Sequence, residues 1–165
     1  LSPALAERLL RRNRDGGRLL NLYGPSETIA ATMHEVGAAD LLRARIPVGR
    51  PLAGRDVLVL SDEGKPVPLN QCGEIWIHSL DMADGYAFSP ASEQQRFAAL
   101  PDRASGQAGR YRTGDLGRWL SDGVLDIVGR RDTQVKLNGV RIELEAIEAT
   151  LMAAPGVRAC IAALV

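Results

Sequence analysis

The chain has 165 residues, 45% of them apolar, so it is long enough and apolar enough to bury a core of its own. Its 20 basic and 20 acidic side chains cancel, which gives no electrostatic reason to expect binding to nucleic acid or to an anionic membrane surface. No apolar run reaches the roughly 18 residues of a membrane-spanning helix, and no secretion signal opens the chain, so we expect a cytoplasmic protein.

The first predicted element is a short amphipathic helix. Ser2 is a typical N-cap, Pro3 suits the first helical turn, and leucines then recur on one face as far as Arg12. Glycines end this helix, and Leu19 to Leu22 predict a short buried strand.

The turn after this strand, Tyr23 to Thr28, places a hydroxyl and a carboxylate next to each other. In open α/β sheets, ligands bind at the carboxyl ends of strands. The hydroxyl of Ser26 can reach a phosphate oxygen, and the carboxylate of Glu27 is a hard oxygen ligand suited to Mg²⁺. The alternative is an ordinary turn in which Ser26 is an N-cap.

The middle of the chain, from Ile46 to Ile77, is rich in β-strand signals. Strands are predicted at Arg55 to Leu60 and at Gly73 to His78. Several prolines keep these strands short, which is typical of a small barrel or a curved sheet. A short helix is expected around Ser92 to Phe97.

Two β-hairpins are predicted in the last third of the chain. The first pairs Leu116 to Leu120 with Val124 to Val128. The second pairs Gln134 to Leu137 with Val140 to Ile142 across Asn138-Gly139, a dipeptide typical of two-residue turns. A helix of about ten residues is expected from Glu143 and a final strand from Val157 to Val165.

The cysteines and histidines indicate no metal or redox site. Cys72 and Cys160 stand alone, so neither a disulfide framework nor a zinc site is expected, and each is interpreted as a small buried residue. His34 and His78 lack a partner at the spacing of a catalytic triad.

Four motifs follow one another along the chain. They are Asn21-Leu22-Tyr23-Gly24-Pro25-Ser26-Glu27, then Gly73-Glu74-Ile75-Trp76-Ile77 with Gly85-Tyr86, then Tyr111-Arg112-Thr113-Gly114-Asp115-Leu116, and finally Gly129 to Lys136 with Gly139 and Arg141-Ile142-Glu143. Together they resemble the adenylate-forming enzymes, in particular the adenylation domains of nonribosomal peptide synthetases. The resemblance covers nearly the whole chain, although Ser26 stands where the family more often has threonine.

The resemblance implies an α/β fold of the mixed α+β type. Residues 1–131 would be the C-terminal portion of the large adenylation core, including a distorted β-barrel, and residues 132–165 the beginning of the small mobile C-terminal subdomain. By the same resemblance, Asp132 matches the hinge between an adenylating and a thioester-forming pose. A hinge consists of a few residues that absorb large changes in backbone conformation. Lys136 and Gly139 would lie on the loop that approaches the nucleotide in the second pose, the alternative being a solvent-exposed hairpin.

The resemblance also implies a reaction. A carboxylate attacks the α-phosphate of Mg·ATP to give an acyl-adenylate and pyrophosphate, and a phosphopantetheine thiol then takes the acyl group. The implied cofactors are ATP and Mg²⁺, and the substrate is an amino acid or related carboxylic acid. The implied partners are a carrier protein, the remaining parts of the same adenylation domain and a small MbtH-like protein.

Site residues follow from the same resemblance. Asp115 would hold the ribose hydroxyls, as an acidic residue does in dinucleotide sites. The other implied nucleotide contacts are Tyr23 facing adenine, Asn21 and Gly24 beside it, Ser26 and Glu27 as the catalytic pair for phosphate and Mg²⁺, and Arg130 at ribose or phosphate oxygens. The implied acyl pocket includes Leu22, Ala30 and Ala31.

The resemblance is incomplete, which leaves alternatives open. The sequence starts after the family's phosphate loop and ends before its Pro-x-Gly-Lys segment, whose lysine neither Lys65 nor Lys136 matches. We therefore expect a nearly inactive fragment, or an adenylation domain interrupted by an inserted domain after Val165. An acyl- or aryl-CoA ligase and a non-catalytic structural platform are the alternative functions. The sequence does not identify the acid that is activated.

Overall fold

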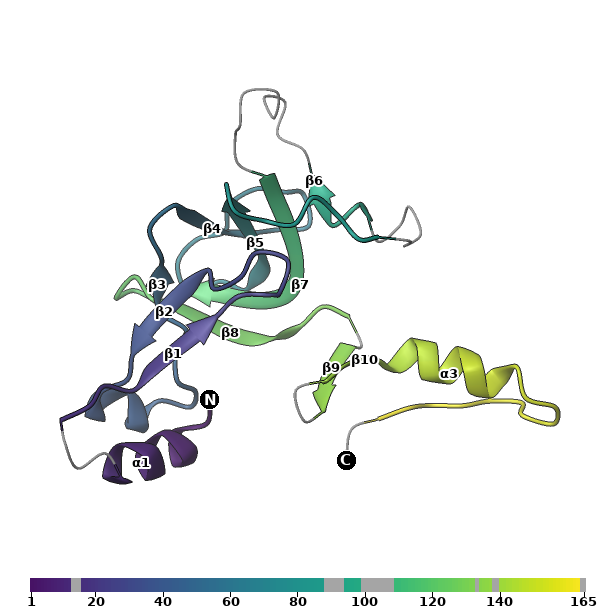
Figure 1. Ribbon diagram of the computed structural model, residues 1–165, viewed down its shortest axis with the longest axis horizontal. Coiled ribbons are helices and arrows are strands. Elements are labelled where there is room, and N and C mark those ends of the chain that lie inside the picture. Colours follow the sequence, from purple (N-terminus) through teal and green to yellow (C-terminus); the bar gives the residue numbers. More distant parts are fainter. Residues whose placement is uncertain (13–15, 88–93, 99–108, 133, 138–139, 164–165) are drawn as a thin grey trace. The chain divides into compact units, whose positions relative to one another are not determined.

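The protein is described from a computed structural model, which divides into two compact units, Leu1–Gly129 and Arg130–Val165 (Figure 1). The described residues are 1–12, 16–87, 94–98, 109–132, 134–137 and 140–163.

The first unit opens with α1 (Pro3–Arg12), as predicted. The Ser2 hydroxyl accepts a hydrogen bond from the main-chain N–H of Leu5 at 3.3 Å, which confirms Ser2 as the N-cap. The helix buries Ala6 against Val36 and Ile46 in a small core. A short 3₁₀ helix, η1 (Ala38–Leu42), lies next to it in contact.

A three-stranded antiparallel sheet follows. Its strands are β1 (Leu20–Tyr23), β2 (Thr32–Glu35) and β3 (Arg50–Pro51), in that order. The predicted strand is therefore present, but the expectation that it is buried is wrong, since Leu20 is 39% and Leu22 56% exposed. Alternate side chains of a strand point to opposite faces, and here only one face is covered. Because the sheet is antiparallel, the turn after β1 is a β1–β2 loop and not the ligand edge of an open parallel sheet.

The main sheet curls around the larger core, in agreement with the expected curved sheet or small barrel (Figure 1). All its pairings along the path β4-β5-β7-β6 are antiparallel, and β8 pairs with β7 off this path. Its fully buried or nearly buried core residues are Ala31, Val48, Val57, Val59, Ile75, Ile77 and Leu125. The strands are β4 (Arg55–Leu60), β5 (Gly73–Ser79), β6 (Phe97–Ala98), β7 (Gly109–Trp119) and β8 (Leu125–Arg130).

Three expectations for this unit need correction. The predicted hairpin strand from Leu116 is the end of a much longer strand, β7, which already begins at Gly109. The predicted helix near Phe97 is wrong at that residue, which pairs with Tyr111 in the sheet, while residues 92 and 93 lie outside the described residues. Cys72 is exposed and not buried as expected, because it lies outside the core, directly before β5.

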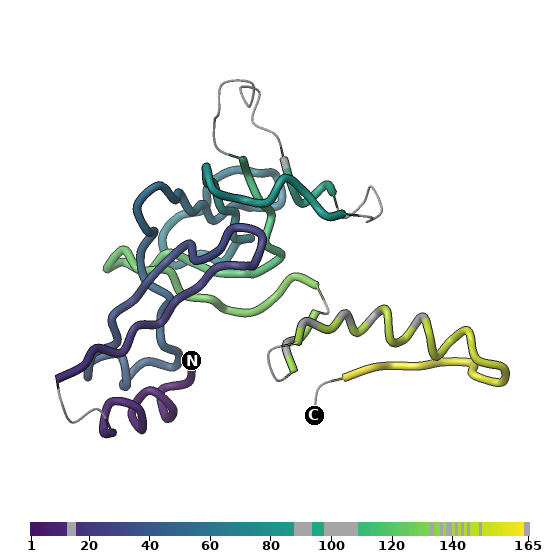
Figure 2. Tube along the Cα trace, in the orientation of Figure 1, coloured from purple at the N-terminus to yellow at the C-terminus, as the bar shows by residue number. Residues whose placement is uncertain are grey.

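The second unit contains the second predicted hairpin. Its strands, β9 (Gln134–Leu137) and β10 (Val140–Glu143), pair with Leu137 opposite Val140, so two residues connect them, and these two lie outside the described residues. The predicted helix is α3 (Leu144–Met152). The predicted strand from Val157 is wrong over residues 157–163, which are not in a strand. This segment runs back along α3, where the N–H of Ala162 donates to Glu148 Oε1 at 2.9 Å (Figure 2).

Candidate functional site

Tyr23 and Asp115 are brought together from opposite ends of the first unit. The Tyr23 hydroxyl donates a hydrogen bond to Asp115 Oδ2 at 2.6 Å, across 92 residues of sequence. Tyr23 ends β1, and Asp115 lies in β7. A hydrogen bond to a carboxylate is short and strong compared with one between neutral groups. The pair therefore fixes both the phenol ring and the carboxylate.

Asp115 owes its position to a bulge in β7. Glu74 of β5 is opposite Leu116 and Trp76 is opposite Arg112, so residues 113–115 together face the single residue 75. Gly114 has φ of +75°, a left-handed conformation that favours glycine. Bulges redirect side chains and often lie next to active sites.

The Thr113 hydroxyl holds this bulge. It donates to the main-chain carbonyl of Ile75 at 2.7 Å and accepts from the main-chain N–H of Asp115 at 2.9 Å. Thr113 is only 2% exposed, so both hydrogen bonds are shielded from water. In the Thr-Gly-Asp motif, the resemblance assigns a role to Asp115 alone. The structure adds structural roles for Thr113 and Gly114, which the sequence reveals only as a threonine and a glycine inside a β-rich segment.

The β1–β2 loop separates the two predicted catalytic side chains. The N–H of Ala31 donates to the carbonyl of Tyr23 at 2.7 Å and closes the loop. A Cβ atom on Gly24 would lie 1.8 Å from the carbonyl oxygen of Ile29, so only glycine fits there. Within the loop Ser26 is exposed, whereas Glu27 is buried with 7% of its surface exposed.

Glu27 is held by two tyrosines. The Tyr86 hydroxyl donates a hydrogen bond to Glu27 Oε1, and the Tyr86 and Tyr111 hydroxyl oxygens lie 3.0 Å apart. Burial, together with the hydrogen bond to Tyr86, raises the pKa of the Tyr111 hydroxyl far above its usual value, so this hydroxyl stays protonated. The hydroxyls of all three tyrosines of the chain thus form hydrogen bonds with Asp115, with Glu27 or with each other.

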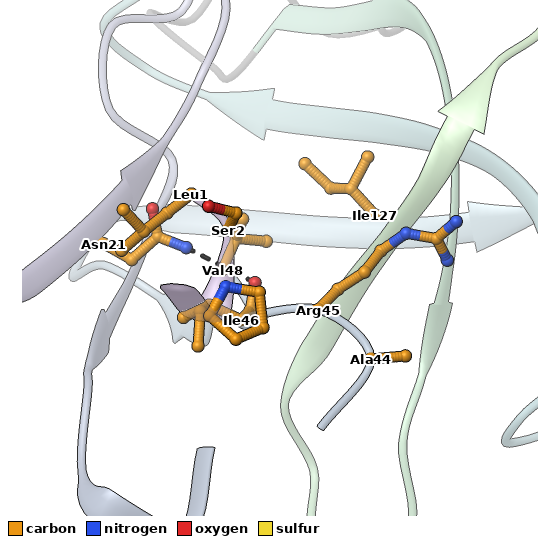
Figure 3. Close-up of a pocket in the computed structure, with 9 residues that line it drawn as sticks. Leu1, Ser2, Asn21, Ala44, Arg45, Ile46, Val48 and Ile127 are labelled. Carbon is orange, nitrogen blue, oxygen red and sulfur yellow. Dashed lines mark hydrogen bonds between the residues drawn. The ribbon is translucent and has the colours of Figure 1, made fainter. Parts of the chain in front are cut away.

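Asn21 lies on the wall of a cavity of about 410 Å³ (Figure 3). Its side-chain amide donates to the carbonyl of Pro47 at 2.8 Å, so the amide is oriented by the main chain. Ile127 and Val48 also line this cavity, but Tyr23 and Asp115 are not among the lining residues. The cavity therefore adjoins the predicted nucleotide contacts only through Asn21.

The predicted acyl-pocket residues have three different environments. Leu22 is more than half exposed, Ala30 is half-buried, and Ala31 is fully buried in the main core. Ala31 also packs in the cluster that contains Ile75 and Leu125.

Arg130 and Asp132 form a bidentate ion pair in the second unit. Arg130 Nε lies 2.6 Å from Asp132 Oδ1, and Arg130 Nη2 lies 2.7 Å from Asp132 Oδ2. Such paired contacts define the geometry of both side chains. Lys136 is in β9, and Gly139 lies outside the described residues.

The residues present fit a magnesium ion that arrives with a nucleotide. Among the described residues, no group of three or more His, Cys, Asp or Glu side chains could hold a metal ion. Mg²⁺ is commonly bound by one or two carboxylates together with substrate phosphates, and Glu27 would be one such carboxylate.

In the parts of the chain that the structure describes, no helix is long and apolar enough to cross a membrane.

Similarity to known proteins shows the family to which this chain belongs. Residues 1–87 match the family model described as AMP-binding enzyme, and the chain belongs to that family. The chain is similar in structure to PA1221, an NRPS protein containing adenylation and PCP domains, with a TM-score of 0.84, 36% identity and coverage of 96% of this chain and 32% of that one. The mixed α+β fold class is thereby confirmed.

Two other proteins extend the similarity. The adenylation domain AlmE of Vibrio cholerae, solved in complex with glycyl-adenosine-5'-phosphate, has a TM-score of 0.78 and 31% identity over 92% of this chain and 28% of its own. Malpinin synthetase of Mortierella alpina is 42% identical over 151 residues, which are 90% of this chain. The chain spans 2% of the length of that synthetase.

Proposed function

We propose that this chain is the nucleotide-binding rear part of an adenylation domain in nonribosomal peptide synthesis. The domain uses ATP to convert an amino acid or related carboxylic acid into an acyl-adenylate and then transfers the acyl group to the phosphopantetheine thiol of a carrier protein. The observation that carries this proposal is the Tyr23–Asp115 hydrogen bond, with Asp115 redirected by the bulge at Gly114.

Asp115 is suited to the ribose of ATP. A carboxylate offers two acceptor oxygens to the two hydroxyls of a vicinal diol. The Tyr23 hydroxyl restrains one of these oxygens, and the Tyr23 ring offers a flat face to adenine. Asn21 lies beside the base, and Gly24 keeps the following loop close to β1.

Ser26 and Glu27 are suited to the phosphates. The exposed hydroxyl of Ser26 can donate to a phosphate oxygen, while the buried carboxylate of Glu27 holds Mg²⁺. Magnesium bound with ATP neutralises charge on the phosphates. The chain's own contribution is to hold the Glu27 carboxylate in one orientation before the nucleotide arrives, through the Tyr86 hydroxyl.

Residues 132–165 are proposed to move. Residues 1–131 belong to the large core and residues 132–165 begin the mobile subdomain, with Asp132 as the hinge. Arg130 exchanges its partner between Asp132 and ribose or phosphate oxygens, since a guanidinium binds carboxylate and phosphate with the same fork. Lys136 and Gly139 act in the thioester-forming pose.

The proposed partners are inferred from similar proteins. A carrier protein is supported by PA1221, which contains adenylation and PCP domains, and an amino acid substrate is supported by the glycyl-adenosine-5'-phosphate bound to AlmE. Leu22, Ala30 and Ala31 contribute to the acyl pocket. The remaining parts of the adenylation domain complete the site, a small MbtH-like protein is a further partner, and the reaction takes place in the cytoplasm.

The proposal is tested in the full-length protein by pyrophosphate exchange. Asp115→Ala should raise the ATP concentration needed for half-maximal exchange, because the ribose loses its acceptor. Asp56→Ala removes an exposed carboxylate from β4 and serves as the matched control, for which no change is expected. An unchanged ATP requirement in Asp115→Ala would contradict the proposal.

A further inference from the structure

We propose that Tyr86 is a positioning residue that orients the Glu27 carboxylate for magnesium. The inference rests on the proposed function, because it presumes that Glu27 binds the ion. Gly85-Tyr86 belongs to a motif of the sequence, but that motif assigns the tyrosine no role. The structure gives it one, since its hydroxyl reaches a carboxylate 59 residues away.

The contact is directed at one oxygen of a buried carboxylate. The Tyr86 hydroxyl donates to Glu27 Oε1, and Glu27 is 7% exposed. A second phenol, Tyr111, lies 3.0 Å from the Tyr86 hydroxyl oxygen and is itself 1% exposed. Because Glu27 and Tyr111 are buried, a hydrogen bond to Glu27 Oε1 is stronger here than at the surface.

The Tyr86 main chain is fixed by Gln94. The N–H of Tyr86 donates to Gln94 Oε1 at 3.2 Å, and Gln94 Nε2 donates to the carbonyl of Tyr86. Gly85 makes this approach possible, because a Cβ atom there would lie 2.5 Å from Gln94 Oε1. One side-chain amide thus satisfies both main-chain groups of Tyr86.

The Tyr86 ring is fixed by Phe97. The Phe97 ring meets the Tyr86 ring edge-on at 5.1 Å between centroids, and it lies 5.1 Å from the Tyr111 ring. Aromatic pairs prefer such edge-on or tilted contacts. Phe97 belongs to β6, which pairs with β7, so the main sheet supports the tyrosine hydroxyl that holds Glu27.

This arrangement has a measurable consequence. Removing a hydrogen-bond partner of a metal ligand typically costs about 10- to 100-fold in metal affinity, because the ligand loses its orientation. Tyr86→Phe removes only the hydroxyl and keeps the ring that packs on Phe97. It should therefore weaken magnesium binding without disturbing the ribose contacts.

The experiment measures binding of a non-hydrolysable ATP analogue to the full-length protein by calorimetry, in magnesium and in EDTA. In Tyr86→Phe, the gain in affinity that magnesium gives should fall about tenfold or more, while the affinity in EDTA stays unchanged. In a Glu27→Gln background, adding Tyr86→Phe should have no further effect on the magnesium gain, because the two side chains act as one unit.

A stability control separates orientation from loss of folding. Val57→Ala shortens a side chain of the main core and leaves Glu27, Tyr86 and Tyr111 unaltered, so it should lower the unfolding temperature and keep the full magnesium gain. The positioning role is overturned if Tyr86→Phe keeps the full gain, or loses no more of it than an equally destabilised Val57→Ala. If the unmodified protein bound the analogue without any gain from magnesium, the proposed role of Glu27 would itself be wrong.

Discussion

The Thr113 hydroxyl joins Asp115 to the neighbouring strand. It accepts a hydrogen bond from the Asp115 N–H at 2.9 Å and donates one to the Ile75 carbonyl at 2.7 Å. Both partners are main-chain groups of the bulge, which regular strand pairing would otherwise satisfy. The direction of the Asp115 carboxylate therefore depends on a buried side chain that does not contact Tyr23 in any described hydrogen bond.

Replacing this hydroxyl should damage both folding and binding. Thr113→Val keeps the shape of the side chain but leaves the Asp115 N–H and the Ile75 carbonyl without their partner, at a cost of about 1–3 kcal/mol. Denaturant unfolding measures that loss, and calorimetry with an ATP analogue should show weaker binding. Thr113→Ser keeps the hydroxyl and is the control. Equal affinity in the valine and serine variants would show that Asp115 is oriented by something else.

The bulge also requires a glycine. Gly114→Ala places a Cβ atom at φ of +75°, which should cost about 1–2 kcal/mol and tilt Asp115 away from Tyr23. Gly64→Ala is the matched control, because Gly64 has φ of +74° in open space between β4 and β5. Both variants should unfold more readily, but only Gly114→Ala should bind nucleotide more weakly. The account fails here if both lose affinity to the same extent.

The Arg130–Asp132 pair should matter to the change of pose. Asp132→Pro fixes the main chain at the proposed hinge and removes the carboxylate that Arg130 contacts. Pyrophosphate exchange reports adenylation, and mass spectrometry of the carrier protein reports thioester formation. We expect the second step to slow far more than the first. If both steps slow together, the hinge assignment is wrong.

His78 should make stability depend on pH. Burial, followed by the nearby charge of Arg110, lowers the pKa of His78 from its usual value of 6.5. Its Nε2 atom accepts a hydrogen bond from Arg110 Nε at 2.8 Å, which a protonated ring could not do. The unfolded state therefore takes up the proton first as the pH falls, so the free energy of unfolding decreases below about pH 6.5.

The comparison that checks this is the unfolding free energy of the natural protein and of His78→Gln between pH 7.5 and 5.5, a window of about one unit on either side of the usual histidine pKa. The variant has no group that titrates at this position, so its stability should fall less on acidification. Parallel curves for the two proteins would mean that His78 does not take part in the pH response.

Local patterns predicted several elements well. The limits of β4 at Arg55 and Leu60 agree with the prediction, because β-branched and aliphatic residues there are bounded by turn residues. The two-residue connection between β9 and β10 follows from Asn138-Gly139. The strand expected from Val157 is absent over residues 157–163, because apolar residues form a strand only where a neighbouring strand pairs with them, and no described strand pairs with this segment.

The site was less visible in the sequence. In the sequence, Thr113 and Gly114 are only a threonine and a glycine inside a β-rich segment, but in the structure they form a bulge, because β5 pairs with β7 both before and after them. The family resemblance assigns Tyr23 and Asp115 to the same nucleotide, but it does not predict their hydrogen bond, which spans 92 residues. The sequence motifs assign no role to Tyr86 or Tyr111, because only the fold brings these two hydroxyls together beside Glu27.

The central claim, that Asp115 binds the ribose hydroxyls, is tested most directly by comparing ATP with 2',3'-dideoxy-ATP in calorimetry on the full-length protein. The unmodified protein should prefer ATP by about 10- to 100-fold, which corresponds to the loss of hydrogen bonds to a charged group. In Asp115→Ala this preference should disappear, with both nucleotides binding weakly. A variant that still preferred ATP to the same degree would contradict the account.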